Sequence, residues 1–218
     1  ISTDEVYGDL KKNKKRADEN SPYKPSSPYA ATKASADHLI KSYIRTYNFP
    51  AIISNCSNNY GPNQFPEKLI PKIIFNILNN MPIQIYAKGL NSREWIYVED
   101  HCRALEMLAN KGKIGQNYNI GTDNNLTNIK LTKLILKKIK KKIKHVGKKV
   151  KIIYVKDRPG HDFRYAINSN KIKKDLKWKP LTDLKNGISK TIDWYIDNME
   201  YFKSIPNKKY LGRLGTKI

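Results

Sequence analysis

The sequence has 218 residues, of which 39% are hydrophobic and 28% are charged. This length allows one large domain or two small ones, and the apolar content excludes a disordered chain. The two cysteines, Cys56 and Cys102, lack metal-ligand spacing, so we expect free thiols in a reducing, cytoplasmic compartment and no metal site. No apolar run is long enough to span a bilayer, and we expect no membrane association.

The formal net charge of +23, from 42 Lys and Arg against 19 Asp and Glu, raises the question of a nucleic-acid partner. The excess is mostly lysine, is spread along the chain and accompanies many asparagines and isoleucines, which A/T-rich codons encode. We therefore interpret the charge as a composition bias on a solvated surface and expect no nucleic-acid partner. The alternative, a nucleic-acid binder, requires positive charge gathered on one face.

The predicted elements begin at residues 1–8 with the end of a strand, and a loop rich in Lys, Asn, Ser and Pro follows at 9–28. Residues 28–47 are expected to form a helix, because proline suits a first helical turn and apolar residues recur at helical spacing. A buried strand is expected at 51–57 and a polar loop at 58–62. The order of strand, helix and strand predicts an α/β sheet, whose ligands bind beyond the carboxyl ends of the strands.

The rest of the chain alternates between the two kinds of element. We expect helices over 69–80, 98–108, 127–146 and 183–198, and strands over 83–86, 94–98, 116–120 and 152–155. The lysines of the 127–146 helix lie mostly opposite its apolar stripe, and we interpret them as a solvated face.

Tyr29 and Lys33 are four residues apart and therefore share one face of the first predicted helix. A lysine beside a phenol lowers the pKa of the phenol by stabilising the phenolate. We expect Tyr29 to act as a general base towards a sugar hydroxyl. The pattern is weak by itself, and an ordinary helix with a surface lysine is the alternative.

Thr3, Asp4 and Glu5 follow the first predicted strand. Adjacent carboxylates repel one another, so their pKa values can separate into an acid role and a base role, and the threonine hydroxyl adds a hydrogen bond. A helix cap or a turn is the alternative.

Three further groups are candidates for binding phosphate or sugar. Asn58, Asn59 and Lys68 carry amides and an ammonium, Arg158 precedes a Pro-Gly pair that favours a forked contact with a diphosphate, and Arg93 is a second phosphate candidate. Plain turns, a surface arginine and a salt bridge are the alternatives.

The motifs Ser-Thr-Asp-Glu-Val-Tyr-Gly, Ser-Pro-Tyr-Ala-Ala-Thr-Lys, Asn-Asn-Tyr-Gly-Pro, Arg-Glu-Trp-Ile-Tyr-Val-Glu-Asp-His and Asp-Arg-Pro-Gly-His-Asp occur in this order. In their order and spacing the chain resembles the dTDP-glucose 4,6-dehydratases of the extended short-chain dehydrogenase/reductase family, from Ile1 to about Tyr201. Asp4 and Glu5 favour this group. Related 4-epimerases resemble Ser-Ser-x at this place, and GDP-mannose dehydratases and UDP-glucuronate decarboxylases resemble Thr-Ser-Glu.

The resemblance implies an α/β fold with part of a Rossmann-type, doubly wound parallel sheet at residues 1–62. A smaller nucleotide-sugar domain would cover 63–201, with a strand near 116–121 returning to the sheet, and a tail would follow at 202–218. It also implies NAD as cofactor, dTDP-glucose as substrate and a homodimer at full length.

By the same resemblance, Tyr29 would deprotonate the 4-hydroxyl of the sugar, while Lys33 would hold the phenolate and bind the nicotinamide ribose. Thr3 would bind the 4-hydroxyl, Glu5 would take the proton from carbon 5, and Asp4 would protonate the departing 6-hydroxyl. The cofactor would also contact Asn59. The nucleotide sugar would contact Asn58, Lys68, Leu69, Gln84, Ile85, Tyr86, Arg93, Asn128, Asp157, Arg158, Pro159, Gly160 and His161.

Relatives in this family begin with a strand and a Gly-x-x-Gly-x-x-Gly turn that binds the NAD diphosphate, and this sequence has no such motif and starts with Ile1. We expect the strand near Ala51 to lose a neighbour, and the chain alone to be unstable and inactive. A truncated sequence, a decayed gene and a split enzyme with its NAD site on another chain stay open. Alternatives are a nucleotide-sugar-binding remnant without redox chemistry, or another dehydratase, epimerase or decarboxylase of the family.

Overall fold

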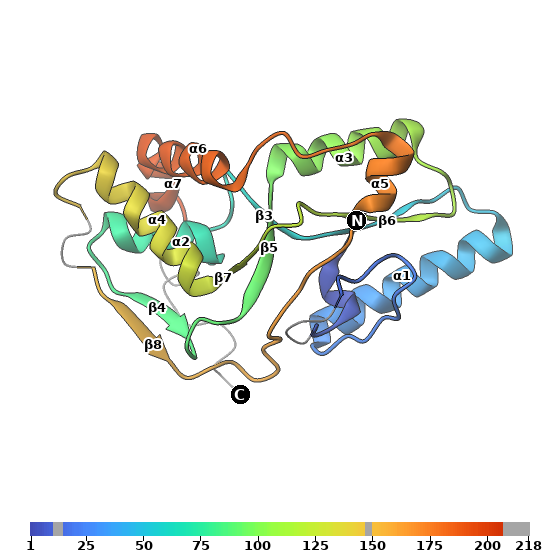
Figure 1. The fold of residues 1–218 in the computed structure, drawn as a ribbon, viewed down its shortest axis with the longest axis horizontal. Helices are drawn as coiled ribbons and strands as arrows, with labels where there is room; N and C mark the ends of the chain where they lie inside the picture. The colour runs from blue at the N-terminus through green and yellow to red at the C-terminus, as the bar shows by residue number, and fades with distance from the viewer. Residues whose placement is uncertain (11–14, 147–149, 207–218) are drawn as a thin grey trace. The chain divides into compact units, whose positions relative to one another are not determined.

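The computed structural model describes residues 1–10, 15–146 and 150–206, which divide into two compact units. Unit 1 consists of the described residues of Ile1–Asn59, Asn91–Asn125 and Asp162–Asp183. Unit 2 consists of Tyr60–Leu90, the described residues of Leu126–His161, and the described residues from Leu184 onward. The units therefore differ from the predicted division at residue 62, because each draws on three separate segments of the chain. Their elements are labelled in Figure 1.

Unit 1 contains a parallel sheet of three strands in the order β1-β2-β6. The strands are β1 (Ser2–Thr3), β2 (Ile53–Cys56) and β6 (Asn117–Ile120). The return of β6 to this sheet confirms the strand expected near 116–121. Because β2 pairs with both β1 and β6, the expectation that the strand near Ala51 lacks a neighbour is wrong. Within the described residues, the strands paired on one side only are β1 and β6.

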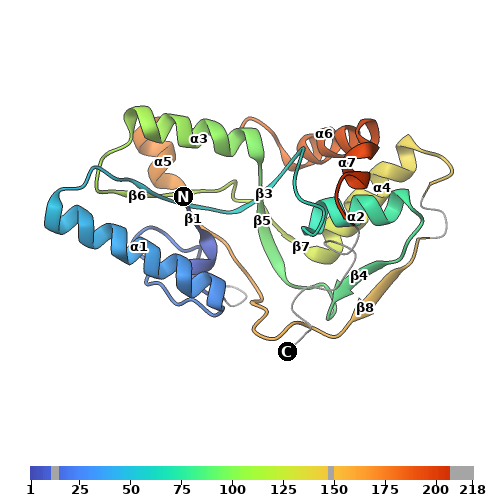
Figure 2. The ribbon, with the colours of Figure 1, turned by 180° about the vertical axis from the view of Figure 1, so that it is seen from behind.

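Helices cover both faces of this sheet, with α1 on one side and α3 and α5 on the other (Figures 1 and 2). They are α1 (Pro28–Tyr47), α3 (Val98–Lys111) and α5 (Asn170–Leu176), and a 3-10 turn, η1 (Asp4–Tyr7), follows β1. One core joins Leu108, Tyr118 and Trp178, and a second joins residues near α1. This arrangement fits the expected doubly wound α/β fold.

The start and end of α1 follow from its sequence. Ser27 is the N-cap, and its hydroxyl accepts a hydrogen bond from the backbone N–H of Ala30 at 3.2 Å. Pro28 occupies the first turn, and Asn48 ends the helix in the left-handed conformation with φ of 52°. The predicted helix over 28–47 is thereby confirmed.

Unit 2 pairs β4 (Ile83–Tyr86) with β8 (Ile152–Val155) in parallel, and both strands match their predicted ranges. Its helices are α2 (Leu69–Leu78), α4 (Asn128–Lys142), α6 (Leu184–Asp197) and α7 (Met199–Lys203). The helix α2 packs against α4, α6 and β4. Isoleucines and leucines of α2 and α4 are fully buried at this contact, among them Ile70, Ile74, Leu131 and Ile135.

A further sheet has the order β3-β5-β7, formed by β3 (Asn58–Tyr60), β5 (Ser92–Tyr97) and β7 (Asn125–Thr127). The predicted loop at 58–62 is therefore partly a strand. The sequence also did not predict β7, α5, α7 or the 3-10 conformation of η1. In the part of the chain that is described, no helix has the length and apolar character needed to cross a bilayer.

Candidate functional site

The carboxyl end of β1 carries the predicted acid pair. Thr3 caps η1, because its hydroxyl oxygen accepts from the backbone N–H of Glu5 at 3.3 Å, and it donates to Asp4 Oδ1 at 3.3 Å. Asp4 is only 3% exposed, and its Oδ2 has no hydrogen-bond partner among the described residues. Burial raises the pKa of Asp4 well above its usual range, the carboxylates of Glu5 and Glu94 raise it further, and Arg93 opposes them. The raised pKa favours the protonated carboxyl of Asp4, the form that can donate a proton.

The helix α1 packs against β1 and η1, and the carboxylates of Glu5 and Asp4 act on the phenol of Tyr29. Tyr29 is 55% exposed, yet partial burial raises the pKa of its phenol, and the negative charge of Glu5 raises it further. The ammonium of Lys33 donates to the backbone oxygen of Ile1 at 2.7 Å. The prediction that the pKa of Tyr29 is lowered is therefore wrong for the chain as described, because partial burial and then the neighbouring negative charges disfavour the phenolate.

The predicted residues Asn58 and Asn59 begin β3, directly after the sheet strand β2. Asn59 Oδ1 lies 2.9 Å from Nδ1 of His101, and its amide nitrogen donates to Cys56 Sγ at 3.5 Å and to the backbone oxygen of Ser57 at 3.2 Å. Burial lowers the pKa of His101 to about 4, so the ring is neutral and Nδ1–H is assigned as the donor to Asn59. His101 could not be predicted as a partner of Asn59, because a lone histidine in the first turn of a helix does not indicate a tertiary contact.

Arg93 of β5 lies buried in unit 1. Its guanidinium donates to the backbone oxygen of Asp162 at 3.0 Å and stands 4.2 Å above the ring of Tyr165. Burial chiefly raises the pKa of Tyr165, and Glu5 also contributes, which places this phenol within electrostatic range of the acid pair. Tyr165, which the sequence did not predict, therefore supports the side chain of the predicted residue Arg93.

Three predicted contacts of unit 2 follow one another on β4. Gln84 is exposed, Ile85 is buried in the core, and Tyr86 is half-buried. Tyr86 pairs with Val155 in the parallel β4–β8 register, so the segment after β8 starts beside it. Because the side chain of Ile85 is buried in the core, it does not support the predicted ligand contact.

The segment after β8 forms a cluster with Tyr86. The Cζ atom of Arg158 lies 5.3 Å from the centroid of the Tyr86 ring. The centroid of the His161 ring lies 6.0 Å from the same Tyr86 centroid. Asp157 Oδ1 lies 2.6 Å from His161 Nδ1 and accepts from the backbone N–H of Arg158 at 2.8 Å. Burial raises the pKa of Asp157, but these hydrogen bonds outweigh it and the net shift is downward. Arg158 Nε is buried without a hydrogen-bond partner among the described residues.

The remaining predicted residues of unit 2 lie at helix starts or in the turn after β8. Lys68 directly precedes α2 and forms an ion pair with Glu67 at 2.9 Å, and Leu69 is the first residue of α2. Asn128 is the first residue of α4, and its buried Oδ1 has no hydrogen-bond partner among the described residues. Pro159 and Gly160 lie in the turn between Arg158 and His161.

The predicted residues thus fall into two sets, one in each unit. Unit 1 holds Thr3, Asp4, Glu5, Tyr29, Lys33, Asn58, Asn59 and Arg93. Unit 2 holds Lys68, Leu69, Gln84, Ile85, Tyr86, Asn128, Asp157, Arg158, Pro159, Gly160 and His161.

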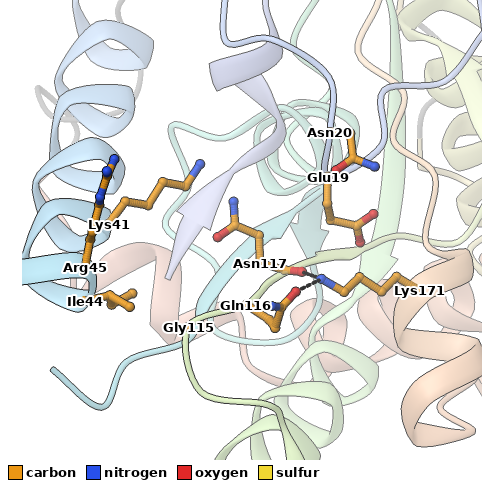
Figure 3. Close-up of a pocket in the computed structure, with 9 residues that line it drawn as sticks. All are labelled: Glu19, Asn20, Lys41, Ile44, Arg45, Gly115, Gln116, Asn117 and Lys171. Atoms are coloured by element: carbon orange, nitrogen blue, oxygen red, sulfur yellow. Dashed lines mark hydrogen bonds between the residues drawn. The ribbon is translucent and has the colours of Figure 1, made fainter. Parts of the chain in front are cut away.

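A pocket of about 300 Å³ in unit 1 lies apart from these residues (Figure 3). Its cationic side chains come from α1 and α5, and Lys171 donates to the side chain of Gln116 at 2.9 Å. None of the predicted site residues lines it. The lining residues are Glu19, Asn20, Lys41, Ile44, Arg45, Gly115, Gln116, Asn117 and Lys171. Within residues 1–10, 15–146 and 150–206, no group of three or more His, Cys, Asp or Glu is placed to hold a metal ion.

The chain is similar to proteins of known structure and function. It is 47% identical over 222 residues to a dTDP-glucose 4,6-dehydratase of Neisseria meningitidis, covering 99% of this chain and 62% of that protein. A crystal structure of dTDP-glucose 4,6-dehydratase from Bacillus anthracis in complex with NAD matches with a TM-score of 0.86 and 43% identity, covering 93% of this chain and 62% of that one. A crystal structure of a UDP-glucose 4-epimerase of Thermotoga maritima matches with a TM-score of 0.82 and 25% identity. The match covers 91% of this chain and 62% of that one.

The chain thus spans about three fifths of the length of these relatives. The model of the family described as GDP-mannose 4,6 dehydratase matches residues 1–191, which is most of the sequence. These matches agree with the resemblance seen in the motifs, and the chain belongs to the GDP-mannose 4,6 dehydratase family.

Proposed function

We propose that this chain is the part of a dTDP-glucose 4,6-dehydratase that carries the acid–base residues and the nucleotide-sugar contacts. The observation that carries the proposal is the buried Asp4 with its raised pKa, next to Glu5 and with Tyr29 of α1 beside them. Removal of water from two neighbouring carbons needs an acid and a base side by side, and this pair supplies both. The identity of 47% to a dTDP-glucose 4,6-dehydratase supports the choice of substrate.

The residues present fit one end of NAD. Tyr29 is exposed and Lys33 follows one helical turn later, which suits the nicotinamide ribose, and Asn59 stays a predicted contact. The sequence has no glycine-rich turn for the NAD diphosphate. In this proposal the diphosphate is therefore held by residues other than Tyr29, Lys33 and Asn59. When bound, NAD accepts a hydride from carbon 4 of the sugar and returns it to carbon 6.

The residues of unit 1 divide the proton transfers between them. Tyr29 takes the proton of the 4-hydroxyl, which Thr3 aligns. For this step the pKa of Tyr29 has to fall, and Lys33 lowers it once its ammonium turns from its present backbone oxygen towards the phenol. Glu5 then takes the proton from carbon 5, and Asp4 gives its proton to the 6-hydroxyl, which leaves as water. Glu5 gives its proton back to carbon 5 when the hydride reaches carbon 6.

For the nucleotide sugar, we propose phosphate contacts at Arg93 and Arg158 and a contact at Tyr86. The support is local to each unit. The buried Nε of Arg158 lacks a partner among the described residues, and its guanidinium lies over the Tyr86 ring. The other residues that the resemblance assigned to the nucleotide sugar stay predictions.

A second candidate function is nucleotide-sugar binding without redox chemistry. The raised pKa of Tyr29 favours it, because a protonated phenol is no base. Other members of the family act on GDP-mannose or UDP sugars, and the Asp4-Glu5 pair is the sequence feature that argues against those substrates.

The test combines binding and turnover. Calorimetry measures dTDP, GDP and UDP binding to the chain, and mass spectrometry detects loss of water from dTDP-glucose or GDP-mannose with NAD+. Both are done with the chain alone and with the chain fused to the amino-terminal segment of the Neisseria meningitidis relative that it does not match. We expect dTDP to bind best, and dehydration of dTDP-glucose by the fusion but not by its Asp4→Asn variant. Binding of dTDP without dehydration by either protein favours the second candidate, and a preference for GDP-mannose contradicts the proposed substrate.

We also propose that the full-length protein is a cytoplasmic homodimer. Both cysteines are free, which suits a reducing compartment. The helix α1 exposes Leu39, Tyr43 and Tyr47, and an apolar helix face of this kind suits pairing with a second copy. Sedimentation of the protein and of its Leu39→Glu variant tests the dimer, and a wild-type monomer contradicts it.

A further inference from the structure

The carboxylate of Asp162 is shared by two segments of unit 1. Its Oδ2 accepts a hydrogen bond from the hydroxyl of Tyr165 at 2.5 Å and a second, short one from the hydroxyl of Ser26. Asp162 is only 6% exposed. A buried carboxylate is costly unless its oxygens accept hydrogen bonds. The carboxylate of Asp162 therefore holds the hydroxyls of Tyr165 and Ser26 in place.

The Tyr165 side of this contact leads to Arg93. The phenol ring of Tyr165 supports the guanidinium, with Cζ at 4.2 Å from the ring centroid. The backbone oxygen of Asp162 accepts from the same guanidinium at 3.0 Å. Asp162 therefore holds Arg93 in two ways, through its own backbone and through the ring that its side chain orients. The position of Arg93 matters because its charge acts on Asp4.

The Ser26 side of the contact leads to the helix that carries Tyr29. Ser26 directly precedes the N-cap Ser27, and Pro28 and Tyr29 are the first two residues of α1. A hydrogen bond at Ser26 therefore fixes the chain just before the helix begins. Because Tyr29 lies in the first turn, its phenol moves with any displacement of this start.

We propose that Asp162 is a positioning residue that sets Arg93 and the start of α1 relative to one another, and so places Tyr29 and Arg93 around the acid pair Asp4 and Glu5. Its importance for turnover rests on the proposed function. The positional claim stands on the contacts of Ser26, Tyr165 and Arg93 alone. It assigns to the Arg-Pro-Gly-His-Asp motif a role beyond the ligand contacts that the resemblance implied.

The test follows two nuclear magnetic resonance signals of the whole chain: the ζ-carbon of Tyr29, assigned with Tyr29→Phe, and the side-chain Nε–H of Arg93, assigned with Arg93→Lys. We expect Asp162→Ala to shift both signals, and Asp162→Asn to restore both, since an amide oxygen still accepts from the two hydroxyls. Ser26→Ala should shift the Tyr29 signal alone, and Tyr165→Phe the Arg93 signal alone. This separation does not arise from a general loss of stability.

Two control variants remove a comparable hydrogen bond elsewhere. Ser21→Ala removes a serine that donates to Asp18 at 2.9 Å, and Tyr201→Phe removes a phenol that donates to the backbone of Asn63 at 2.8 Å. Neither should shift the Tyr29 or Arg93 signals. The proposal is wrong if Asp162→Ala leaves both signals in place, if Asp162→Asn does not restore them, or if the controls shift them equally. Where Asp162→Ala does not fold, the single-bond variants decide.

Binding of dTDP, measured by calorimetry on the same variants, separates this proposal from the proposed function. If Arg93 binds phosphate, Asp162→Ala and Tyr165→Phe should weaken dTDP binding about five-fold, the effect of losing roughly one neutral hydrogen bond, and Ser26→Ala should not. No dTDP binding by the wild-type chain contradicts the proposed function, whereas the two spectroscopic signals still decide the role of Asp162. Equal weakening by all three variants and by the controls contradicts the positioning role.

Discussion

Replacing Gly187 by alanine probes how tightly α6 packs on Tyr60. In an exposed helix interior this change stabilises by up to about 1 kcal/mol, because glycine is a poor helix former. Here the added Cβ would stand 2.2 Å from the phenol oxygen of Tyr60 and 2.9 Å from its Cζ. Tyr60 is only 1% exposed, so its ring has little room to move away.

The balance between these two effects gives the size of the change. Forcing an extra methyl group into a packed core costs about 1–3 kcal/mol, which exceeds the helix gain of up to about 1 kcal/mol. We therefore expect Gly187→Ala to lower the free energy of unfolding by about 1–2 kcal/mol. A change of 1 kcal/mol moves the Tm of a protein of this size by about 2–4 °C, so the Tm should fall by several degrees.

Urea denaturation of four proteins makes the reasoning testable: the wild type, Gly187→Ala, Tyr60→Phe and the double variant. Phenylalanine lacks the oxygen that lies nearest to the added Cβ, so the alanine should cost less in the Tyr60→Phe background. A Gly187→Ala variant that gains stability would refute the packing argument, as would an identical cost of the alanine in both backgrounds.

Three further predictions concern the stability of unit 1. Because burial lowers the pKa of His101 to about 4, the neutral ring contributes stability above its usual pKa of 6.5, and this contribution is lost as the pH falls towards 4. The loss amounts to about 3 kcal/mol. Urea denaturation between about pH 7 and pH 4.5 should show that the free energy of unfolding depends less on pH in His101→Gln than in the wild type. The same pH dependence in both proteins contradicts the burial argument. Asp100→Ala removes the acceptor of the backbone N–H groups of Leu181 and Thr182, both at 2.9 Å. The free energy of unfolding should fall by about 2–4 kcal/mol, and by less in Asp100→Asn, which keeps one acceptor oxygen. Equal losses in the two variants contradict the role of Asp100 as a hydrogen-bond acceptor. Ser27→Ala removes the N-cap of α1 and should cost about 1 kcal/mol, with faster amide hydrogen exchange in the first turn that Ser27→Asn does not show.

The elements that the sequence predicted well are those whose reason is local. The strand β4 alternates apolar and polar residues, β8 is a short run of apolar and aromatic residues, and α1 begins at Ser27-Pro28 and ends at a left-handed Asn48. The strands β3 and β7 are asparagine-rich and look like loops, and they become strands because β5 lies between them. The short helix α5 was missed because it is rich in lysine and buries a single side chain, that of Ile172.

The candidate site divides in the same way. The neighbourhood of Thr3, Asp4, Glu5 and Tyr29 could be predicted, because a strand end and the next helix of a parallel sheet lie close together. The direction of the Tyr29 pKa shift could not, because it depends on the burial of the phenol and on its distances to charged groups, which residue spacing does not contain. The stacking of Tyr165 on a distant arginine has no local signal either, since it depends on tertiary structure.

The interleaving of the two units has a consequence for how the protein is made. Neither unit is one uninterrupted stretch of sequence, so neither can be excised as a simple fragment by shortening the chain at one end. During synthesis β1 and α1 emerge before the other elements of unit 1, and the segment that ends at Asp183 must also emerge before unit 1 can close. Each unit can therefore close only after residues of the other unit have been synthesised, and its apolar surface stays exposed to solvent or chaperones until then.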